Sequence, residues 1–395
     1  MKLTLHGAAL LLAGVRSVAT QGAPDPQKIF GATSSSLQEQ RLVQLSADPR
    51  DTRWLSFEER QALKRNEMFY KDVTSYSQEQ RFAWASDKLT ADIAQHDYGS
   101  PRNSTLAHDA IATIDMSHGE KHLRWLTSLH TRWCETETGL QASMYLFNLL
   151  KSYVDTAPVG EHRLISLQPH FHDFKQFSMV VRIAGPNTTA LDPVSITGAH
   201  IDSASLSGNL EVAPGADDDG SGTVTMLETA RVLLGSRYTP AAGHAVEMHF
   251  YAGEEAGLLG SAAIAAKYKE LGVRVAGMMQ FDMLAWVSDS ENEHIGITVS
   301  RNRDLSEFNK KLVDTYLSIP WVEESTYPWG ASDSASWGDL GYPSSDALEG
   351  TWPETRSHKV HTTNDNMDHK EFSWPHIREA IKLAVAFHIE LGGEA

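Results

Sequence analysis

The feature that most constrains the fold is an alternation of strand-like and helix-like segments along the middle of the chain. Strands are predicted at 179–183, 194–201, 244–251, 275–284 and 295–299, and helices at 117–129, 139–154, 222–234, 257–271, 304–317 and 375–391. Alternation of this kind indicates βαβ units and a sheet with a parallel core. We therefore predict an α/β fold of three layers, in which helices flank both faces of a mixed sheet.

Several acidic residues and histidines stand where the predicted strands end. They are His200 and Asp202, Glu254 and Glu255, Asp282 and, in a later loop, His361. Open α/β sheets bind ligands beyond the carboxyl ends of their strands. A polar residue at the end of a strand is common, but the shared placement of these residues indicates one functional site. Residues two apart in a strand share a face, so Asp202 is placed to orient the imidazole of His200.

Three consecutive aspartates, Asp217, Asp218 and Asp219, follow the strand that ends near His200, and glycines stand on both sides of them. Adjacent carboxylates repel one another, and no basic residue stands nearby in the sequence. The cluster is therefore either a solvated acidic turn or a cation site. The nearby histidine favours a cation, because carboxylate oxygen with imidazole nitrogen suits zinc or a similar divalent ion.

Glu254 and Glu255 stand between two glycines directly after a predicted strand, where the chain turns sharply. Paired glutamates at the start of a helix often only complement the helix dipole. At a sharp turn, however, adjacent side chains diverge, so that one can bind a metal while the other faces the substrate. Hydrolysis needs this division between a ligand that holds zinc and a base that takes a proton from water.

Other chemistries lack their motifs in this chain. There is no H-E-x-x-H of zincins, no G-x-S-x-G of α/β-hydrolases and no phosphate-binding G-x-x-x-x-G-K-S/T loop. The single cysteine, Cys134, allows neither a thiolate zinc site nor an intrachain disulfide. The net charge of −17 argues against nucleic acid as a partner, because phosphate binding needs a basic face.

These motifs, in this order, resemble those of the secreted di-zinc aminopeptidases, the bacterial and fungal leucine aminopeptidase family of zinc exopeptidases. The matching stretches are 198–203, 213–222, 252–261, 280–283 and 360–365. The resemblance runs from about residue 89 to the C-terminus. It implies an aminopeptidase that hydrolyses the N-terminal residue of peptides with a free N-terminus and favours large apolar residues.

The resemblance also implies a set of metal ligands. Asp218 would bridge two zinc ions. Glu255 and His361 would complete the coordination of one ion, and His200 and Asp282 that of the other. Two such ions polarise the scissile carbonyl and activate water, and one of them can hold the free α-amine of the substrate.

Further roles follow from the same resemblance. Glu254 would be the general base, Asp202 would orient the metal-binding histidine, and a cis peptide would join Asp218 to Asp219. The chain departs from the family pattern at Ser334, where members often carry a histidine, and at Trp329, where several relatives place a tyrosine near the reacting carbonyl. These departures bear on substrate preference and leave the metal ligands intact.

The N-terminus has the pattern of a secretory signal peptide over residues 1–19. Lys2 supplies the positive end, residues 8–15 form a short apolar core, and small residues precede a cut after Ala19. This core is too short to span a bilayer, and no later stretch approaches the required length. We therefore expect a secreted protein without a membrane partner, and the sequons of Asn103 and Asn187 fit that route. We also expect a monomer.

Residues 20–85 are predicted to form a helical prosegment, and residues 86–395 the catalytic domain. A helix is expected at 54–63, opened by Ser56 as its N-cap with Glu59 three residues later. No strand is expected in this segment. Because a helix with an apolar stripe must pack against something, we predict that the prosegment docks on the catalytic domain, assists its folding or restrains its activity, and is cut near 75–90. A permanent N-terminal extension is the alternative.

The same fold leaves other functions open. Glutaminyl cyclases, carboxypeptidases and metal-free binding modules are also built on it. The cyclase type uses one zinc ion, so two zinc ions per chain would argue against a cyclase. Binding modules have lost metal ligands, whereas this chain keeps all five and the base.

Overall fold

The structure, a computed structural model, describes residues 36–93, 96–158, 163–288 and 292–395. The predicted signal peptide lies outside the described residues, and so do residues 20–35 of the predicted prosegment. None of the helices in these ranges combines the length and the apolar character that crossing a membrane requires.

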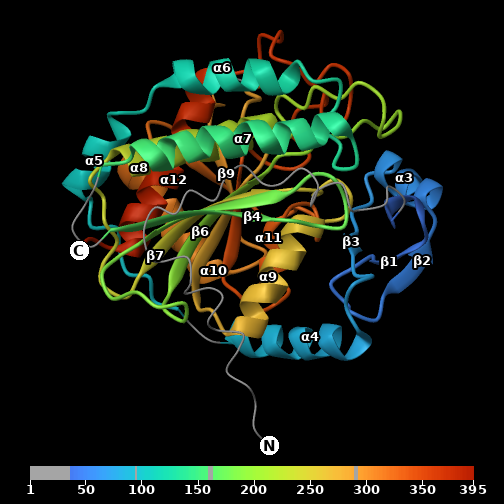
Figure 1. Ribbon diagram of the computed structural model, residues 1–395, viewed down its shortest axis with the longest axis horizontal. Coiled ribbons are helices and arrows are strands. Elements are labelled where there is room, and N and C mark those ends of the chain that lie inside the picture. The colour runs from blue at the N-terminus through green and yellow to red at the C-terminus, as the bar shows by residue number, and fades with distance from the viewer. Residues whose placement is uncertain (1–35, 94–95, 159–162, 289–291) are drawn as a thin grey trace, which may run out of the picture.

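An eight-stranded sheet runs through the middle of the molecule (Figure 1). In spatial order its strands are β10 (Trp321–Glu324), β9 (Ile295–Thr298), β11 (Ser344–Leu348), β8 (Val275–Phe281), β6 (Val194–His200), β7 (Ala245–Tyr251), β5 (Ser178–Ala184) and β4 (Leu164–His170). The central strands β7, β6, β8 and β11 are parallel. At one edge, β5 and β4 pair in antiparallel fashion. This mixed sheet with a parallel core confirms the predicted fold class.

Helices cover both faces of the sheet (Figure 1). They are α5 (Thr105–Ile111), α6 (Met116–Thr127), α7 (Glu137–Thr156), α8 (Gly220–Gly235), α9 (Leu259–Leu271), α10 (Arg303–Tyr316), α11 (Ser334–Gly338) and α12 (Trp374–Gly392). Buried residues of α7, α8, α10 and α12 form one large apolar cluster, and those of α9 and α11 form a smaller one.

The sheet supplies residues to both clusters because successive residues of a strand point to opposite faces. In β7, Met248 and Phe250 join the larger cluster, whereas Ala245 and Tyr251 join the smaller one. Every residue of β6 and β7 is buried, which is why both segments read as nearly continuous apolar runs. Cys134, the only cysteine in the sequence, is fully buried in the larger cluster.

The described part of the N-terminal segment is not purely helical. It contains η1 (Ser36–Gln38), β1 (Arg41–Gln44), β2 (Thr52–Leu55), α3 (Phe57–Arg65), β3 (Lys71–Asp72) and α4 (Gln78–Ile93). The three strands form a small antiparallel sheet in the order β2-β1-β3. The prediction that this segment lacks strands was therefore wrong, because strands of two to four residues are too short to show an alternating pattern. Helix α3 does begin after Ser56, which forms the expected capping box with Glu59.

The N-terminal segment docks on the rest of the protein through β3, the strand of the small sheet that lies between β1 and α9 in Figure 1. The backbone N–H of Asp72 donates to the carbonyl of Gly257 at 3.0 Å. Gly257 has a φ of +109°, and a Cβ there would lie 2.9 Å from the ring of Tyr70. A second contact is the ion pair between Lys71 and Asp339, with an N–O distance of 3.3 Å.

Candidate active site

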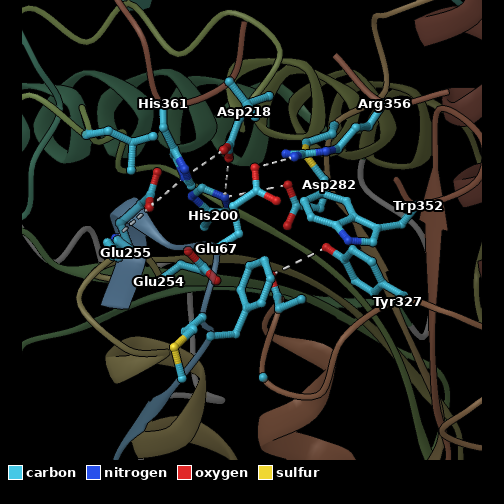
Figure 2. A pocket seen from close by; sticks show the side chains of 18 of the residues that line it. Glu67, His200, Asp218, Glu254, Glu255, Asp282, Tyr327, Trp352, Arg356 and His361 are labelled. Carbon is cyan, nitrogen blue, oxygen red and sulfur yellow. Dashed lines mark hydrogen bonds and ion pairs between the residues drawn. The ribbon is translucent and has the colours of Figure 1, made fainter. Parts of the chain in front are cut away.

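A pocket with a cavity volume of about 180 Å³ lies at the carboxyl ends of the parallel strands. It is lined by all of the predicted metal-binding residues and by Glu254, which Figure 2 shows converging on one place. These residues are His200, Asp218, Glu255, Asp282 and His361. The sequence prediction that separate strand ends supply one site therefore agrees with where the structure places these residues.

One group of three side chains is formed by His200, Asp218 and Asp282. His200 is the last residue of β6, Asp282 directly follows β8, and Asp218 stands two residues before α8. The Nε2 atom of His200 lies 3.1 Å from Oδ1 of Asp218 and 3.6 Å from Oδ1 of Asp282. All three side chains are buried.

A second group is formed by Asp218, Glu255 and His361. The Nε2 atom of His361 lies 3.1 Å from Oδ2 of Asp218 and 3.0 Å from Oε2 of Glu255. Asp218 thus turns one carboxylate oxygen toward each group. The two imidazoles also affect the pKa of Asp218. Burial disfavours the charged carboxylate, but His361 and His200 together lower its pKa.

The donors of both groups fit zinc. Imidazole nitrogen and carboxylate oxygen bind zinc at about 2.0–2.2 Å in tetrahedral sites, which places neighbouring ligand atoms roughly 3.4 Å apart. The four distances given above lie on either side of that value. In addition, Oδ1 of Asp282 and Oε1 of Glu255 are buried and have no hydrogen-bond partner among the described residues. Buried oxygens of this kind are costly unless a cation binds them.

Asp202 supports the site from beneath the pocket. It is fully buried, and its Oδ1 lies 3.5 Å from Nδ1 of His200, a nitrogen that has no hydrogen-bond partner among the described residues. Its two oxygens also accept hydrogen bonds from the backbone N–H groups of Glu254 and Glu255, both at 3.1 Å. Asp202 therefore fixes the glutamate turn as well as facing the histidine.

The backbone around Asp218 is held in a similar way. The peptide between Asp218 and Asp219 is cis, as the resemblance implied. Asp219 accepts from the backbone N–H of His200 at 3.0 Å. The carboxylate of Asp365 accepts from the N–H groups of Asp217 and Asp218, at 2.9 and 3.1 Å. Asp365 was part of a matching stretch, but its contact across 147 positions gave no local signal in the sequence.

Glu254 differs from its neighbour in environment. Both side chains line the pocket, but Glu255 is buried against His361, whereas Glu254 is only partly buried. Burial is the largest effect on the Glu254 carboxyl group and raises its pKa well above its usual range. The imidazole of His200 opposes this rise, and the Glu255 carboxylate adds to it. A carboxylate with a raised pKa accepts a proton more readily, as a general base must.

One aromatic residue expected at the pocket lies elsewhere. Trp329 does not line the pocket, and its indole N–H donates to Asp339 at 3.3 Å. Tyr327, two residues earlier, lines the pocket instead, with its ring 5.8 Å from that of Trp352. The expectation for Trp329 was therefore wrong. The Ser334 hydroxyl lies outside the pocket lining and donates to Asp346.

Lys64 of α3 also reaches the pocket, which the sequence did not reveal. Its Nζ lies 2.8 Å from Oε2 of Glu255, and only 13% of its side chain is exposed. Burial opposes the charge, but the carboxylates of Glu255 and Glu254 and the neighbouring Tyr70 hold the pKa of Lys64 above its usual value. Because 191 positions separate Lys64 from Glu255, no local pattern could predict the contact.

Comparisons with known proteins agree with this geometry. The profile of peptidase family M28 matches residues 178–388. Leucine aminopeptidase 1 of Penicillium rubens is 33% identical over 377 residues, covering 93% of this chain and 94% of the relative. Leucine aminopeptidase 1 of Grosmannia clavigera is 35% identical over 364 residues, covering 89% and 85%. The crystal structure of the LapA aminopeptidase of Legionella pneumophila superposes with a TM-score of 0.75 at 25% identity, covering 87% of this chain and 92% of that one.

Proposed function

This chain belongs to peptidase family M28 and is an aminopeptidase, and we propose that it is a secreted di-zinc enzyme acting on large apolar N-terminal residues. The curated relatives that match most of its length are leucine aminopeptidases. The cyclase, carboxypeptidase and binding-module alternatives are therefore not favoured. Because both groups of candidate ligands come from one chain, the proposal needs only a monomer.

The observation that carries the proposal is the position of Asp218 between two groups of ligands. Each group holds one histidine and one further carboxylate, and Asp218 offers a different oxygen to each. A shared carboxylate is the arrangement that two neighbouring ions require. When bound, zinc ions of this kind polarise the scissile carbonyl and lower the pKa of water.

Three further residues, Glu254, Asp202 and Tyr327, have roles beside those of the candidate metal ligands. Glu254 lines the pocket beside the candidate ligands. We therefore assign it the role of general base, which takes a proton from the attacking water and then gives it to the departing amine. Asp202 holds the backbone of Glu254 at 3.1 Å and so fixes where that carboxylate stands. The hydroxyl of Tyr327 keeps its proton and can donate a hydrogen bond, because burial raises its pKa well above the usual value.

The pocket walls support a preference for large apolar residues. Met283, Tyr327, Ala331 and Val360 line the pocket and form one buried apolar cluster, against which Trp352 packs. An apolar side chain gains about 25 cal/mol for each Å² that it buries against such walls. The relatives named leucine aminopeptidase are consistent with this preference.

We also infer that the N-terminal segment up to about residue 85 is a prosegment that restrains activity. Residues of this segment occupy the mouth of the pocket: Lys64 pairs with Glu255, and Met68, Phe69 and Tyr70 contribute to the lining. A substrate would have to displace them. Secretion is inferred from the pattern of residues 1–19, and both sequon asparagines are exposed.

The test joins metal content to activity. Mass spectrometry of the secreted enzyme, purified as its host releases it, should find two zinc ions, and the same preparation should hydrolyse leucine p-nitroanilide. One zinc ion per chain would contradict the shared role of Asp218. Two zinc ions without hydrolysis of any amino-acid anilide would contradict the assigned activity.

A further inference from the structure

Arg356 lines the same pocket as the metal-binding residues, yet the reaction described above does not use it. Its side chain is only 12% exposed. The guanidinium carbon lies 4.0 Å from the centre of the Trp352 ring, and Figure 2 shows the group directed into the pocket. Stacking on an indole fixes the plane of a guanidinium and leaves its N–H groups available at the edge.

In the structure Arg356 holds a carboxylate. Its Nη2 donates to Oε1 of Glu67 at 2.5 Å, a contact marked in Figure 2. Glu67 follows α3 in the N-terminal segment, and its side chain is 59% exposed. Its φ is +54°, a backbone conformation that residues other than glycine rarely adopt. The Nε of Arg356 is buried and has no hydrogen-bond partner within the described ranges. Glu67 therefore uses only part of a group that can bind a carboxylate with two parallel hydrogen bonds.

The charge of Arg356 is isolated within the pocket. Of the described residues from 96 onward that line it, Arg356 is the only lysine or arginine. Removal of the N-terminal segment takes Glu67 away and leaves the guanidinium without the carboxylate that it binds in this structure. Because a guanidinium can bind a carboxylate with two parallel, charge-assisted hydrogen bonds, the uncovered pocket would favour a ligand that brings a carboxylate.

We propose that Arg356 is a specificity-determining residue that binds a carboxylate of the substrate peptide, an inference that rests on the proposed aminopeptidase activity. Glu67 takes the place of that carboxylate while the segment is docked. Lys64, three residues earlier, presents an ammonium to Glu255 in the same pocket.

A short peptide carries the same two charges, an ammonium at one end and a carboxylate about 3.3–3.6 Å further along per residue. The carboxylate that Arg356 binds is either the C-terminus of a di- or tripeptide or an acidic side chain close to the scissile bond. Both sources offer the same chemistry to the guanidinium, and they are separated by experiment.

The experiment compares substrates that differ by one negative charge, using the secreted enzyme as the host releases it. The pairs are Leu-Gly against Leu-Gly-amide, Leu-Glu-amide against Leu-Gln-amide, and glutamyl against glutaminyl p-nitroanilide. For each pair the ratio of kcat/KM, charged over neutral, is measured in the wild type, in Arg356→Met, which keeps a stem over Trp352, and in Arg356→Lys, which keeps the charge without the fork. Arg124→Met, at an exposed arginine of α6 that pairs with Glu120, is the matched control.

Arg356→Met should lower the ratio roughly tenfold or more in at least one pair, mainly through KM, as expected for a lost hydrogen bond to a charged group. Arg356→Lys should lower it less, and Arg124→Met should not change it. A fall in the first pair identifies short peptides as substrates, and a fall in either of the others identifies acidic side chains.

Ratios that stay within twofold of the wild type in all three pairs would overturn the inference. A wild type that hydrolyses none of the neutral substrates would instead overturn the proposed function, so the two failures are distinct. The thermal midpoint of each variant is measured in parallel, and if Arg356→Met does not fold, Arg356→Lys decides the outcome by the same criterion.

Discussion

Replacing Lys64 with methionine should loosen the N-terminal segment from the pocket. The methionine keeps most of the unbranched stem of the lysine, whose nitrogen lies 5.6 Å from the centroid of the Trp133 ring. It removes the ammonium that pairs with Glu255 at 2.8 Å. The change therefore tests the ion pair with little change in apolar contact.

The size of the effect follows from how buried the pair is. An ion pair in solvent is worth about 0–1 kcal/mol, but the side chains of Lys64 and Glu255 are only 13% and 2% exposed. A hydrogen bond to a charged group with little solvent contributes about 1.5–3 kcal/mol. Since each 1.4 kcal/mol is a factor of ten, the population of chains with an undocked segment should rise roughly 10- to 150-fold.

Limited proteolysis of the metal-free chain, kept in a chelator, measures that population. When docking and release are faster than cleavage, the cleavage rate is proportional to the undocked fraction, and mass spectrometry shows that the cuts fall within the N-terminal segment. Lys267→Met, at an exposed lysine of α9 that pairs with Glu270, is the matched control. If Lys64→Met is cut within twofold of the wild-type rate, the ion pair does not hold the segment and the reasoning fails.

Three further predictions concern the site and the core. Glu254→Gln should keep both zinc ions and lose ~10²–10⁴-fold in kcat; zinc content that falls in step with activity would show that Glu254 is a ligand instead. Asp282→Ala and His361→Ala should each lower the zinc content or the zinc affinity measured by mass spectrometry and chelator competition, and unchanged affinity in either variant would remove that residue from the ligand set. Burial lowers the pKa of His388 to about 3, so the unfolded chain, with a histidine pKa of about 6.5, binds one more proton between these values. The free energy of unfolding should therefore fall as the pH drops below 6.5, by up to ~1.4 kcal/mol per pH unit from this residue, and His388→Asn should show a shallower slope in urea titrations between pH 6.5 and 4.5; parallel slopes would refute this.

The parts of the fold that could be predicted are those whose burial is complete on both faces. Strands β6 and β7 read as apolar runs, and the expected and observed positions agree to within a residue. Strand β11 was missed because it begins Ser344-Ser345-Asp346, although all five of its residues are buried. The carboxylate of Asp346 is paired with distant residues: Thr298 and Arg301 both donate to it, at 2.9 and 3.1 Å. No window of sequence contains that information.

The site also has residues that could be predicted from the sequence and residues that could not. His200 and Glu255 stand where predicted strands end, so their sequence positions predicted a common place, whereas Asp218 was singled out from three adjacent aspartates by the family resemblance. Lys64 and Arg356 have no such context, because each acquires its role only through a residue far away in the chain. Contacts of that kind depend on how the N-terminal segment docks, and docking is a tertiary property.

The single cysteine gives the protein a built-in reporter of unfolding. Cys134 lies fully inside the larger apolar cluster, and burial raises the pKa of its thiol well above the usual value. The folded chain should therefore be almost inert to a thiol-reactive dye, since the thiolate is the reactive form. Because there is only one thiol, each chain can be labelled only once, and the time course of labelling at high dye concentration gives the rate at which the surrounding core opens.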